Sequence, residues 1–515
     1  MAPLQDTIIQ AAQERLHIVL IEKLLRSCDV ESIYILIRNK KEDDIHTRIG
    51  KIFDDPLFDL VKRDHPKFRH KIITIAGDCM LPGLGINSND RSLLIKNVNV
   101  VFHVAATVRF DEKLKLALAI NVCGTREILT LAKEMENLKC PINFSVRDEV
   151  ENCFRYVTTT KLALFSQAIV HVSTAYANCN RTDIDEKFYK PMLSGENALK
   201  MADALDDKTL DKMTPDLLGE WPNTYTYTKA LAEDLIKNHS RGLPIAVFRP
   251  AIVIPTYKEP IKGWIDNMYG PTGIIVGVAA GLLRVLHINQ HNNAELVPVD
   301  MCVNSLIASG YDIGTNSYEE PPVYNFVTSP KNPITWRTYT DLGIEYGKNV
   351  PLSKSAWYYS FTMSESKAWV TFLTFFYHFV PAAIVDFGLF VCGKKPKLLD
   401  TYRKIHRLCH VLSYFTTCKW VFSNNNVKNL YEKLDDRDKE LFYFNMEEIN
   451  WREFISQSML GIRTYLMKED PKNLPEARKR FYRLKYLHIT TIWTFRLVAM
   501  YLLYKLIVRF LVPAF

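Results

Sequence analysis

Residues 98–105 read VNVVFHVA, a short run of β-branched and aromatic residues that predicts a fully buried strand. Four runs of the same kind flank it: 33–37 (IYILI), 71–76 (KIITIA), 168–173 (AIVHVS) and 244–248 (PIAVF). Each is separated from the next by enough residues for a crossover helix. Buried runs that alternate with helices indicate a parallel sheet covered on both faces. We therefore predict an α/β fold, a Rossmann-like doubly wound parallel sheet, within a domain spanning residues 1–345.

The second half of the chain has a different character. Residues 350–470 are rich in aromatics and helical in pattern, which predicts a helical C-terminal domain. Within it, residues 368–392 are almost continuously apolar, and 485–515 are apolar again. A membrane-spanning helix needs about 20 apolar residues, so both runs are long enough. Because Asp386 and Arg496 interrupt them, two buried helices of a soluble domain are the alternative to the membrane association that we expect, above all through 485–515.

Composition excludes several classes of protein. The 515 residues contain 65 Lys+Arg and 57 Asp+Glu, a net charge of +8, with 48% hydrophobic residues. These values are ordinary for a globular chain and exclude a disordered or collagen-like one. No basic block indicates nucleic-acid binding. Ten cysteines without metal-ligand spacing predict neither a metal site nor a disulfide scaffold, and favour reduced thiols in a cytosol-facing protein. The first residues carry acids and no apolar core, so we do not expect a signal peptide.

The most informative motif is NTYTYTKALAE, residues 223–233. Asn223 suits a helix start, and Tyr225 and Lys229 then lie four residues apart on one face. A lysine ammonium near a phenol favours the phenolate, and such a tyrosine can pass a proton to a carbonyl oxygen. The spacing alone is weak evidence, since Tyr501 and Lys505 repeat it inside the apolar tail.

Polar and small residues follow the predicted strands. Ser173 and Thr174 come at the end of one strand, and Ala105 and Ala106 end another. Because ligands bind at the carboxyl edge of an open parallel sheet, the hydroxyls are candidates to bind a substrate carbonyl and the alanines leave room for a flat cofactor. Asn121 begins the helix that follows.

Charged residues follow two further strands. Asp78 ends KIITIAGD, where its carboxylate would meet an adenine amine. Arg38, followed by Lys40 and Lys41, ends the strand at 33–37. Basic groups after the second strand match a 2′-phosphate, so we expect NADP rather than NAD.

These motifs together resemble the alcohol-forming fatty acyl-CoA reductases of the insect type, a branch of the extended short-chain dehydrogenases. The resemblance rests on VFHVAATVRFDEKLKLALAINVCGT, HVSTAYANC, NTYTYTKALAE, FRPAIVIP, VYNFVTSPKNPITW and FYFNMEEINW, and extends from about residue 21 to the end.

The resemblance implies that NADPH reduces a long-chain fatty acyl-CoA to an aldehyde and then to a fatty alcohol, on a membrane of the endoplasmic reticulum or peroxisome. By position, it implies catalytic roles for Tyr225, Lys229, Thr174, Ser173 and Asn121. The residues that it implies for cofactor binding are Arg38, Asp78, Ala105, Ala106, Thr107, Tyr225, Lys229 and Pro250.

The chain departs from the family pattern in two places. The family opens with a strand and a Gly-rich turn, but the first glycine here is Gly50, so we predict that both are missing and that the N-terminus is a helix. Such a turn lets the backbone bind a pyrophosphate. The second departure is an insertion at 140–167. Our hypothesis is a retained intron there and a wrong first exon at 1–18; a genuine surface loop is the alternative for the insertion.

Three functions remain open at this point. The first is an NADPH-dependent fatty acyl-CoA reductase. The second is a catalytically impaired, membrane-attached relative that binds acyl ligands or a partner. The third, an enzyme acting on a sterol or a sugar, would not need the helical half. Residues after the sixth strand, Trp264, Met268, Tyr269 and 270–277 (GPTGIIVG), are either an acyl site or plain core, while Lys258 and Lys262 are either CoA-phosphate ligands or solvated surface.

Overall fold

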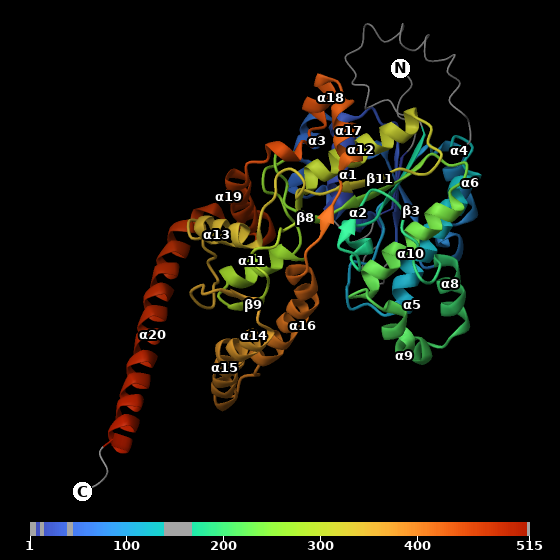
Figure 1. Cartoon of the computed structure of the whole chain (residues 1–515). Helices are drawn as coiled ribbons and strands as arrows, with labels where there is room; N and C mark the ends of the chain where they lie inside the picture. The colour runs from blue at the N-terminus through green and yellow to red at the C-terminus, as the bar shows by residue number, and fades with distance from the viewer. Residues whose placement is uncertain (1–6, 11–14, 39–44, 139–166, 512–515) are drawn as a thin grey trace. The chain divides into compact units, whose positions relative to one another are not determined.

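A seven-stranded parallel sheet forms the core of the first of two compact units in the computed structural model (Figure 1). The structure describes residues 7–10, 15–38, 45–138 and 167–511. The first unit comprises residues 1–264, 293–334 and 418–451, and the second comprises 265–292, 335–417 and 452–515. The functional boundaries predicted at 345, 350–470 and 485–515 stay a prediction.

The strand order of the sheet is β3-β2-β1-β4-β5-β7-β11. The bounds are β1 Thr7–Gln10, β2 Ile33–Ile37, β3 Ile72–Ala76, β4 Val100–His103, β5 Ala168–Val172, β7 Ile245–Pro250 and β11 Val323–Phe326. Strands β2 and β3 follow β1 toward one edge of the sheet. The chain then returns to place β4 on the other side of β1, so the strand order reverses between β1 and β4. This is the doubly wound topology, and its switch point is where such sheets bind ligands. The predicted fold class is confirmed.

The prediction that the first strand is missing is wrong. Thr7–Gln10 (TIIQ) forms β1 in the middle of the sheet, where Thr7 pairs with Ile33 of β2 and Val100 of β4. Pairing on both sides satisfies the backbone of this segment, and such tertiary context overrides the helical tendency of the neighbouring sequence. The prediction that the N-terminus forms one long helix is therefore also wrong. Residues 11–14, where the Gly-rich turn is expected, lie outside the described residues.

Helices cover the sheet on both faces (Figure 1). Helices α4, α6 and α10 pack over one face, and α1 and α12 pack over the other. The bounds are α1 Arg15–Ser27, α4 Ser88–Asn97, α6 Gly124–Glu134, α10 Thr224–His239 and α12 Val299–Thr315. The insertion predicted between α6 and β5 falls outside the described residues except for its last residue, Gln167, so both accounts of it stay hypotheses.

The second unit is mainly helical. Its elements include α11 Pro271–Ala279, β9 Val285–His287, α13 Trp336–Gly347, β12 Thr362–Ser364, α14 Lys367–Thr374, α15 Val380–Val391, α16 Leu398–Thr417, α19 Trp451–Gly461 and α20 Leu474–Leu511. Two stretches are long and apolar enough to cross a membrane, Lys367–Val391 and Pro471–Arg509. None of the apolar window within Pro471–Arg509 is buried, so the alternative of two helices buried in a soluble domain does not describe α20.

Candidate active site

Helix α10 carries Tyr225 and Lys229 one turn apart. Asn223 caps the helix, since its Oδ1 accepts a hydrogen bond of 2.9 Å from the amide of Thr226. The predicted helix start is confirmed. Tyr225 is half-buried, and its ring meets Phe110 edge to face with the ring centroids 5.6 Å apart.

Lys229 is fixed against the end of β5. Lys229 is 2% exposed, and its ammonium donates a hydrogen bond of 2.7 Å to the carbonyl oxygen of Val172, the last residue of that strand. Burying a charge costs free energy unless the charge is paired or hydrogen-bonded. This hydrogen bond therefore holds α10 against the end of β5. The face bearing Tyr225 and Lys229 therefore lies at the carboxyl edge of the sheet, where Ser173 and Thr174 follow.

The two hydroxyls after β5 have different partners. Ser173 Oγ donates to Glu233 Oε1 over 2.5 Å. Thr174 Oγ1 accepts from the amide of Tyr176 over 3.3 Å. Accepting a bond uses a lone pair of the hydroxyl and not its hydrogen. Thr174 therefore keeps a donor for a substrate carbonyl, whereas the hydrogen of Ser173 is already committed to a carboxylate.

A buried ion pair that the sequence analysis missed supports Ser173. Arg249 of β7 donates to both oxygens of Glu233, at 2.9 and 2.7 Å, and both side chains are almost fully buried. Glu233 lies one turn after Lys229 on α10. The sequence did carry a signal for Glu233. It lies four residues after Lys229, as Lys229 lies four residues after Tyr225, so all three share one face of the helix.

Asn121 joins the loop after β4 to α10. Its Oδ1 accepts from the Thr107 amide and its Nδ2 donates to Thr228 Oγ1, both over 2.9 Å. Asn121 sits in a π-helical turn, Leu118–Cys123, a feature frequent at functional sites. Both polar ends of its side chain are thus used to hold Thr107 and the turn of helix between Tyr225 and Lys229, which makes Asn121 a positioning residue in this arrangement.

Two paired histidines lie beneath this arrangement. His103 of β4 and His171 of β5 are neighbours in the sheet, with ring centroids 5.0 Å apart. Burial, with the nearby charge of Lys229, lowers the pKa of His103 to about 3 and lowers the pKa of His171 well below its usual value. Both rings are therefore neutral at physiological pH. His103 Nε2 is bonded to Thr125 Oγ1 over 3.1 Å, and that hydroxyl donates to the carbonyl oxygen of Asn121.

Arg38 and Asp78 meet at the other end of the carboxyl edge. The Arg38 Nε lies 3.9 Å from Asp78 Oδ2, at the ends of β2 and β3. Gly77, the residue before Asp78, is closely packed, because a Cβ there would lie 2.4 Å from Leu36 Cδ1 and 2.8 Å from the carbonyl oxygen of Leu84. The Arg38 side chain is half exposed, which leaves it available to an anionic ligand. Lys40 and Lys41 lie outside the described residues.

The described residues that could hold a nicotinamide dinucleotide lie at the carboxyl ends of the strands. Arg38 and Asp78 offer a cation and a carboxylate for an adenosine, while the buried alanines Ala105 and Ala106 follow β4 beside the switch point. Pro250, the last residue of β7, is buried next to Phe326 of β11.

The residues predicted for the acyl site lie in three different environments. Trp264 is 1% exposed and its indole donates to Asp55 over 2.8 Å, so it belongs to the core of the first unit. Met268 and Tyr269 are about half exposed. Five residues of α11 instead line a cavity within the second unit: Pro271, Ile274, Ile275, Val278 and Ala279. The Lys258 ammonium lies over the ring of Tyr443, 3.4 Å from its centroid.

Two family models match the chain. A NAD-binding model described as male sterility protein matches residues 16–306, and a second model with the same description matches residues 377–469. The first covers more than half of the chain.

Full-length relatives match as well. The chain is 48% identical over 493 residues to the fatty acyl-CoA reductase wat of Drosophila melanogaster, covering 96% of this chain and 90% of that protein. It is 34% identical over 482 residues to fatty acyl-CoA reductase 1 of Rattus norvegicus, covering 93% and 88%. Among solved structures, the reductase domain of a nonribosomal peptide synthetase from Mycobacterium tuberculosis has a TM-score of 0.54 at 17% identity, covering 90% of this chain and 92% of that one. This last likeness shows the fold.

Proposed function

Since the chain belongs to the fatty acyl-CoA reductase family, we propose that it reduces a long-chain fatty acyl-CoA to the primary alcohol with NADPH as the reductant. The observation that carries the mechanism is the 2.7 Å bond from Lys229 to the carbonyl oxygen of Val172. It holds Lys229 at the strand end that precedes Thr174, with Tyr225 one turn before Lys229 on the same helix. This supports a site in which a phenol, an ammonium and a hydroxyl act together.

When bound, the reduced nicotinamide supplies a hydride to the carbonyl carbon in each of two reductions. Thr174 and Tyr225 are the hydrogen-bond donors for the carbonyl oxygen. In the first reduction the carbon–sulfur bond breaks, and CoA leaves as the thiolate with the electron pair of that bond, giving the aldehyde. In the second, Tyr225 passes its proton to the aldehyde oxygen as the alcohol forms. The Lys229 ammonium stabilises the phenolate that remains.

The preference for NADPH rests on Arg38. Its half-exposed guanidinium follows β2, the position at which a basic group accommodates the 2′-phosphate of NADP. The Asp78 carboxylate accepts from the Met80 amide over 3.0 Å, which holds it toward the same edge.

A second function is favoured by one observation. The chain has no glycine before Gly50, so the sequence that follows β1 lacks the glycines that let a backbone approach a pyrophosphate. A catalytically impaired relative that binds acyl ligands or a partner would tolerate that change. Measured NADPH binding separates the two, because only the enzyme requires it.

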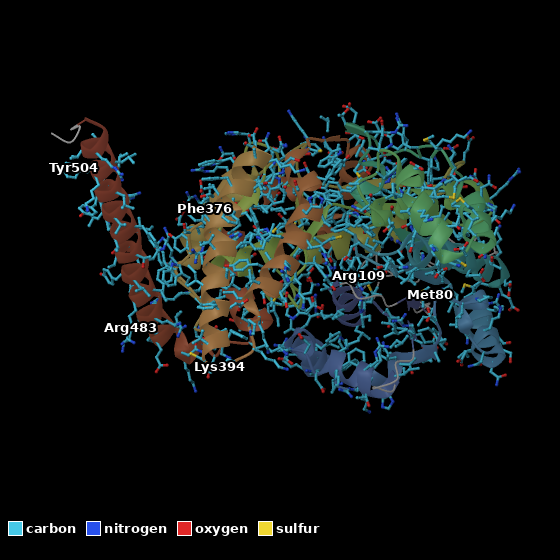
Figure 2. All side chains as sticks on the ribbon, turned by 90° about the horizontal axis from the view of Figure 1, so that it is seen from below. Met80, Arg109, Phe376, Lys394, Arg483 and Tyr504 are labelled. Atoms are coloured by element: carbon cyan, nitrogen blue, oxygen red, sulfur yellow. The ribbon has the colours of Figure 1, made fainter. Side chains whose placement is uncertain are left out.

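We propose that α20 anchors the protein by crossing a membrane. Its apolar residues are exposed, among them Phe495 at 72% and Leu497 at 58%. Basic residues such as Arg478 and Arg483 precede them, and Figure 2 shows Arg483 and Tyr504 toward opposite ends of the helix. Such basic residues attract anionic head groups. The reductase then faces the cytosol, where acyl-CoA is available, on the endoplasmic reticulum or the peroxisome.

The second apolar stretch, Lys367–Val391, has one polar, protein-bound face. His378 Nε2 accepts from the Arg284 amide over 2.9 Å, and Asp386 accepts from the amides of Lys397, Leu398 and Leu399 at the start of α16. The opposite face is exposed and aromatic: Trp369, Phe372, Phe376, Phe387 and Phe390 (Figure 2 labels Phe376). A helix with one apolar face suits the plane of a bilayer surface. We therefore propose that this stretch lies on the membrane and does not cross it.

An N-glycosylation acceptor distinguishes these topologies in microsomes. An acceptor sequence inserted after Gly393 stays unmodified if Lys367–Val391 lies on the cytosolic surface, and one appended beyond α20 is modified if that helix spans. Modification after Gly393 would show that the first stretch crosses the membrane.

The reductase activity is tested with palmitoyl-CoA and NADPH on the full chain in detergent. Tyr225→Phe should abolish alcohol formation while NADPH binding persists, because only the proton donor is removed. Tyr227→Phe is the matched control, since Tyr227 is buried against Trp221 with their ring centroids 5.5 Å apart. Unchanged activity in Tyr225→Phe would remove Tyr225 from the mechanism.

A further inference from the structure

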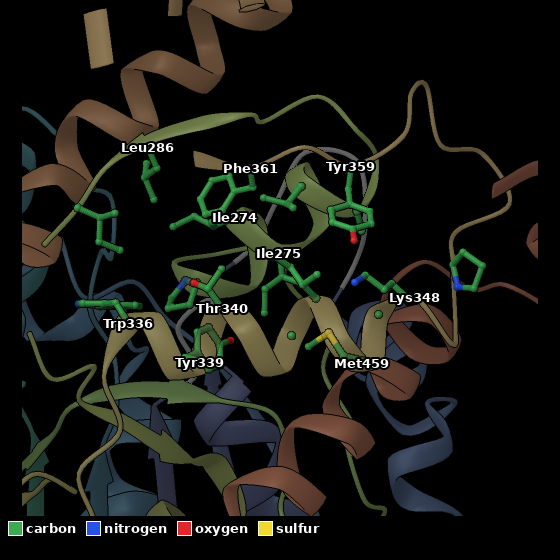
Figure 3. A pocket seen from close by; sticks show the side chains of 18 of the residues that line it. Ile274, Ile275, Leu286, Trp336, Tyr339, Thr340, Lys348, Tyr359, Phe361 and Met459 are labelled. Carbon is green, nitrogen blue, oxygen red and sulfur yellow. The ribbon is translucent and has the colours of Figure 1, made fainter. Parts of the chain in front are cut away.

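The second unit contains an elongated apolar cavity (Figure 3). The cavity and the open solvent at its mouth together occupy about 780 Å³. Its walls come from α11, β9, α13, the segment before β12, α19 and α20. Every residue that lines it belongs to the second unit.

The lining is hydrocarbon along most of its length. Ile274 and Ile275 of α11 and Leu286 of β9 face α13, and Phe361 covers them (Figure 3). A buried apolar wall of this kind binds ligands that make no hydrogen bonds, because a polar group placed there would lose its water without a new partner.

The cavity is longer than a compact ring system requires. Its lining along α13 and the capping residue after it runs from Trp336 to Lys348, twelve residue steps, which at about 1.5 Å a step is about 18 Å. Lys348 stands at one end, its ammonium 5.4 Å from the centre of the Tyr359 ring. The cavity is thus a slot with one cationic end. A slot of this form is complementary to an acyl chain that carries a polar head.

Gly343 opens the floor of the slot. It lies inside α13, where glycine costs about 1 kcal/mol relative to alanine. A Cβ added there would have its nearest atom, Ile275 Cδ1, at 4.0 Å. Position 343 would accept a side chain without a steric clash, so glycine is not needed there to avoid one. The missing side chain instead leaves its volume to the cavity.

We propose that this slot binds one long acyl chain and that Gly343 sets how much of the chain it accepts. The inference rests on the proposed function in one respect, its choice of the acyl chain of the fatty acyl-CoA as the occupant. A membrane lipid offers the same hydrocarbon from another source.

The chain-length test uses the full chain with palmitoyl-CoA and octanoyl-CoA. Gly343→Phe should lower kcat/KM for palmitoyl-CoA by roughly tenfold or more, equivalent to about 1.4 kcal/mol, and leave octanoyl-CoA nearly unchanged. Gly343→Ala should fall between wild type and Phe. Thr338→Phe, on the exposed side of α13, is the control for added bulk. Equal losses for both substrates, or none, would overturn the inference.

A binding test separates this inference from the proposed function. In the Tyr225→Phe protein, cis-parinaric acid should bind, palmitoyl-CoA should displace it, and Gly343→Phe should weaken both. If these results hold while the wild-type chain makes no alcohol, the slot stands and the proposed function fails. Displacement by lysophosphatidylcholine but not by palmitoyl-CoA overturns the assignment to substrate. Unaltered parinaric acid binding in Gly343→Phe, with an unchanged melting temperature, overturns the slot itself.

Discussion

Ser173 donates its hydroxyl hydrogen to Glu233 over 2.5 Å, while Thr174, the next residue, accepts a hydrogen bond from the Tyr176 amide. Adjacent hydroxyls at one strand end thus have opposite hydrogen-bonding roles. One is bound into a buried ion pair, and the other keeps its hydrogen for a substrate.

This difference predicts opposite effects of two substitutions. Thr174→Val should reduce kcat about 100-fold, since it removes a donor to the reacting oxygen. It should lower the free energy of unfolding by only about 0.5–1.5 kcal/mol, the value of the neutral hydrogen bond that Thr174 accepts from the Tyr176 amide. Ser173→Ala should lower the free energy of unfolding by about 1.5–3 kcal/mol, the value of a hydrogen bond to a charged group, with a smaller effect on kcat. Steady-state kinetics beside thermal unfolding measure both. The reverse pattern would make Ser173 the donor to the substrate.

Breaking the ion pair beneath Ser173 should destabilise the protein strongly. Arg249→Met leaves the Glu233 carboxylate buried without its partner, which costs about 3–5 kcal/mol. The double variant Arg249→Met/Glu233→Gln should recover part of that loss, because the buried charge is gone. Fluorescence-monitored denaturation of the full chain gives both values. A single variant as stable as wild type would show that the pair contributes nothing to the fold.

Cofactor choice should change with Arg38. Arg38→Ala should raise KM for NADPH roughly tenfold, about 1.4 kcal/mol, and leave KM for NADH nearly unchanged, since only NADPH carries the 2′-phosphate. Arg63→Ala is the control, because that exposed arginine of α3 (Asp59–Asp64) pairs with Asp64. If KM rises equally for both cofactors, Arg38 does not bind the 2′-phosphate.

Acidification should destabilise the fold through His103. Its pKa is lowered from 6.5 to about 3, so the unfolded chain binds a proton first as the pH falls. The free energy of unfolding therefore decreases from about pH 6.5 downward, by about 2 kcal/mol at about pH 5 for this residue. His103→Phe should flatten this dependence, and His239→Gln, at the exposed end of α10, should not. The check is the denaturation midpoint from pH 7 to 5; equal slopes in wild type and His103→Phe would contradict it.

The two departures from the family pattern give a test in yeast. The chain as given is expressed beside a version with a Gly-rich strand and turn at its start and without 140–167. If only the altered version makes fatty alcohol, the N-terminal turn and the insertion account for the loss of activity. If both versions make fatty alcohol, the phosphate site works without glycine. The hypothesis of a wrong exon and a retained intron then has no loss of activity to explain.

The fold was largely predictable because its signals are local. Strands such as β4 and β5 are continuous buried runs, and Asn223 marks the start of α10. The exception is β1. Four residues, Thr7–Gln10, have no local signal strong enough to separate them from the helix-forming residues that follow, and only their pairing with β2 and β4 defines them.

The site was predictable in part for the same reason. Tyr225 and Lys229 can be recognised as candidates from their spacing in the sequence. Thr174 can be recognised because it follows a predicted strand. Arg249 does not, because a charged residue inside a buried strand can be recognised only when its partner is known. Gly343 had no sequence signal either, since its effect depends on the helix and strand that face it.

The interleaving of the two units has a consequence for how the chain folds during synthesis. Each unit is assembled from three separate segments, and the first includes residues 418–451, where β13 (Val421–Phe422) pairs with β6 (Asp183–Ile184). Folding on the ribosome normally completes one domain before the next emerges. Here the sheet can form early, but its unit stays open until about residue 451 has been translated. Aromatic segments of the second unit emerge in that interval, which is when this chain most needs a chaperone or a membrane.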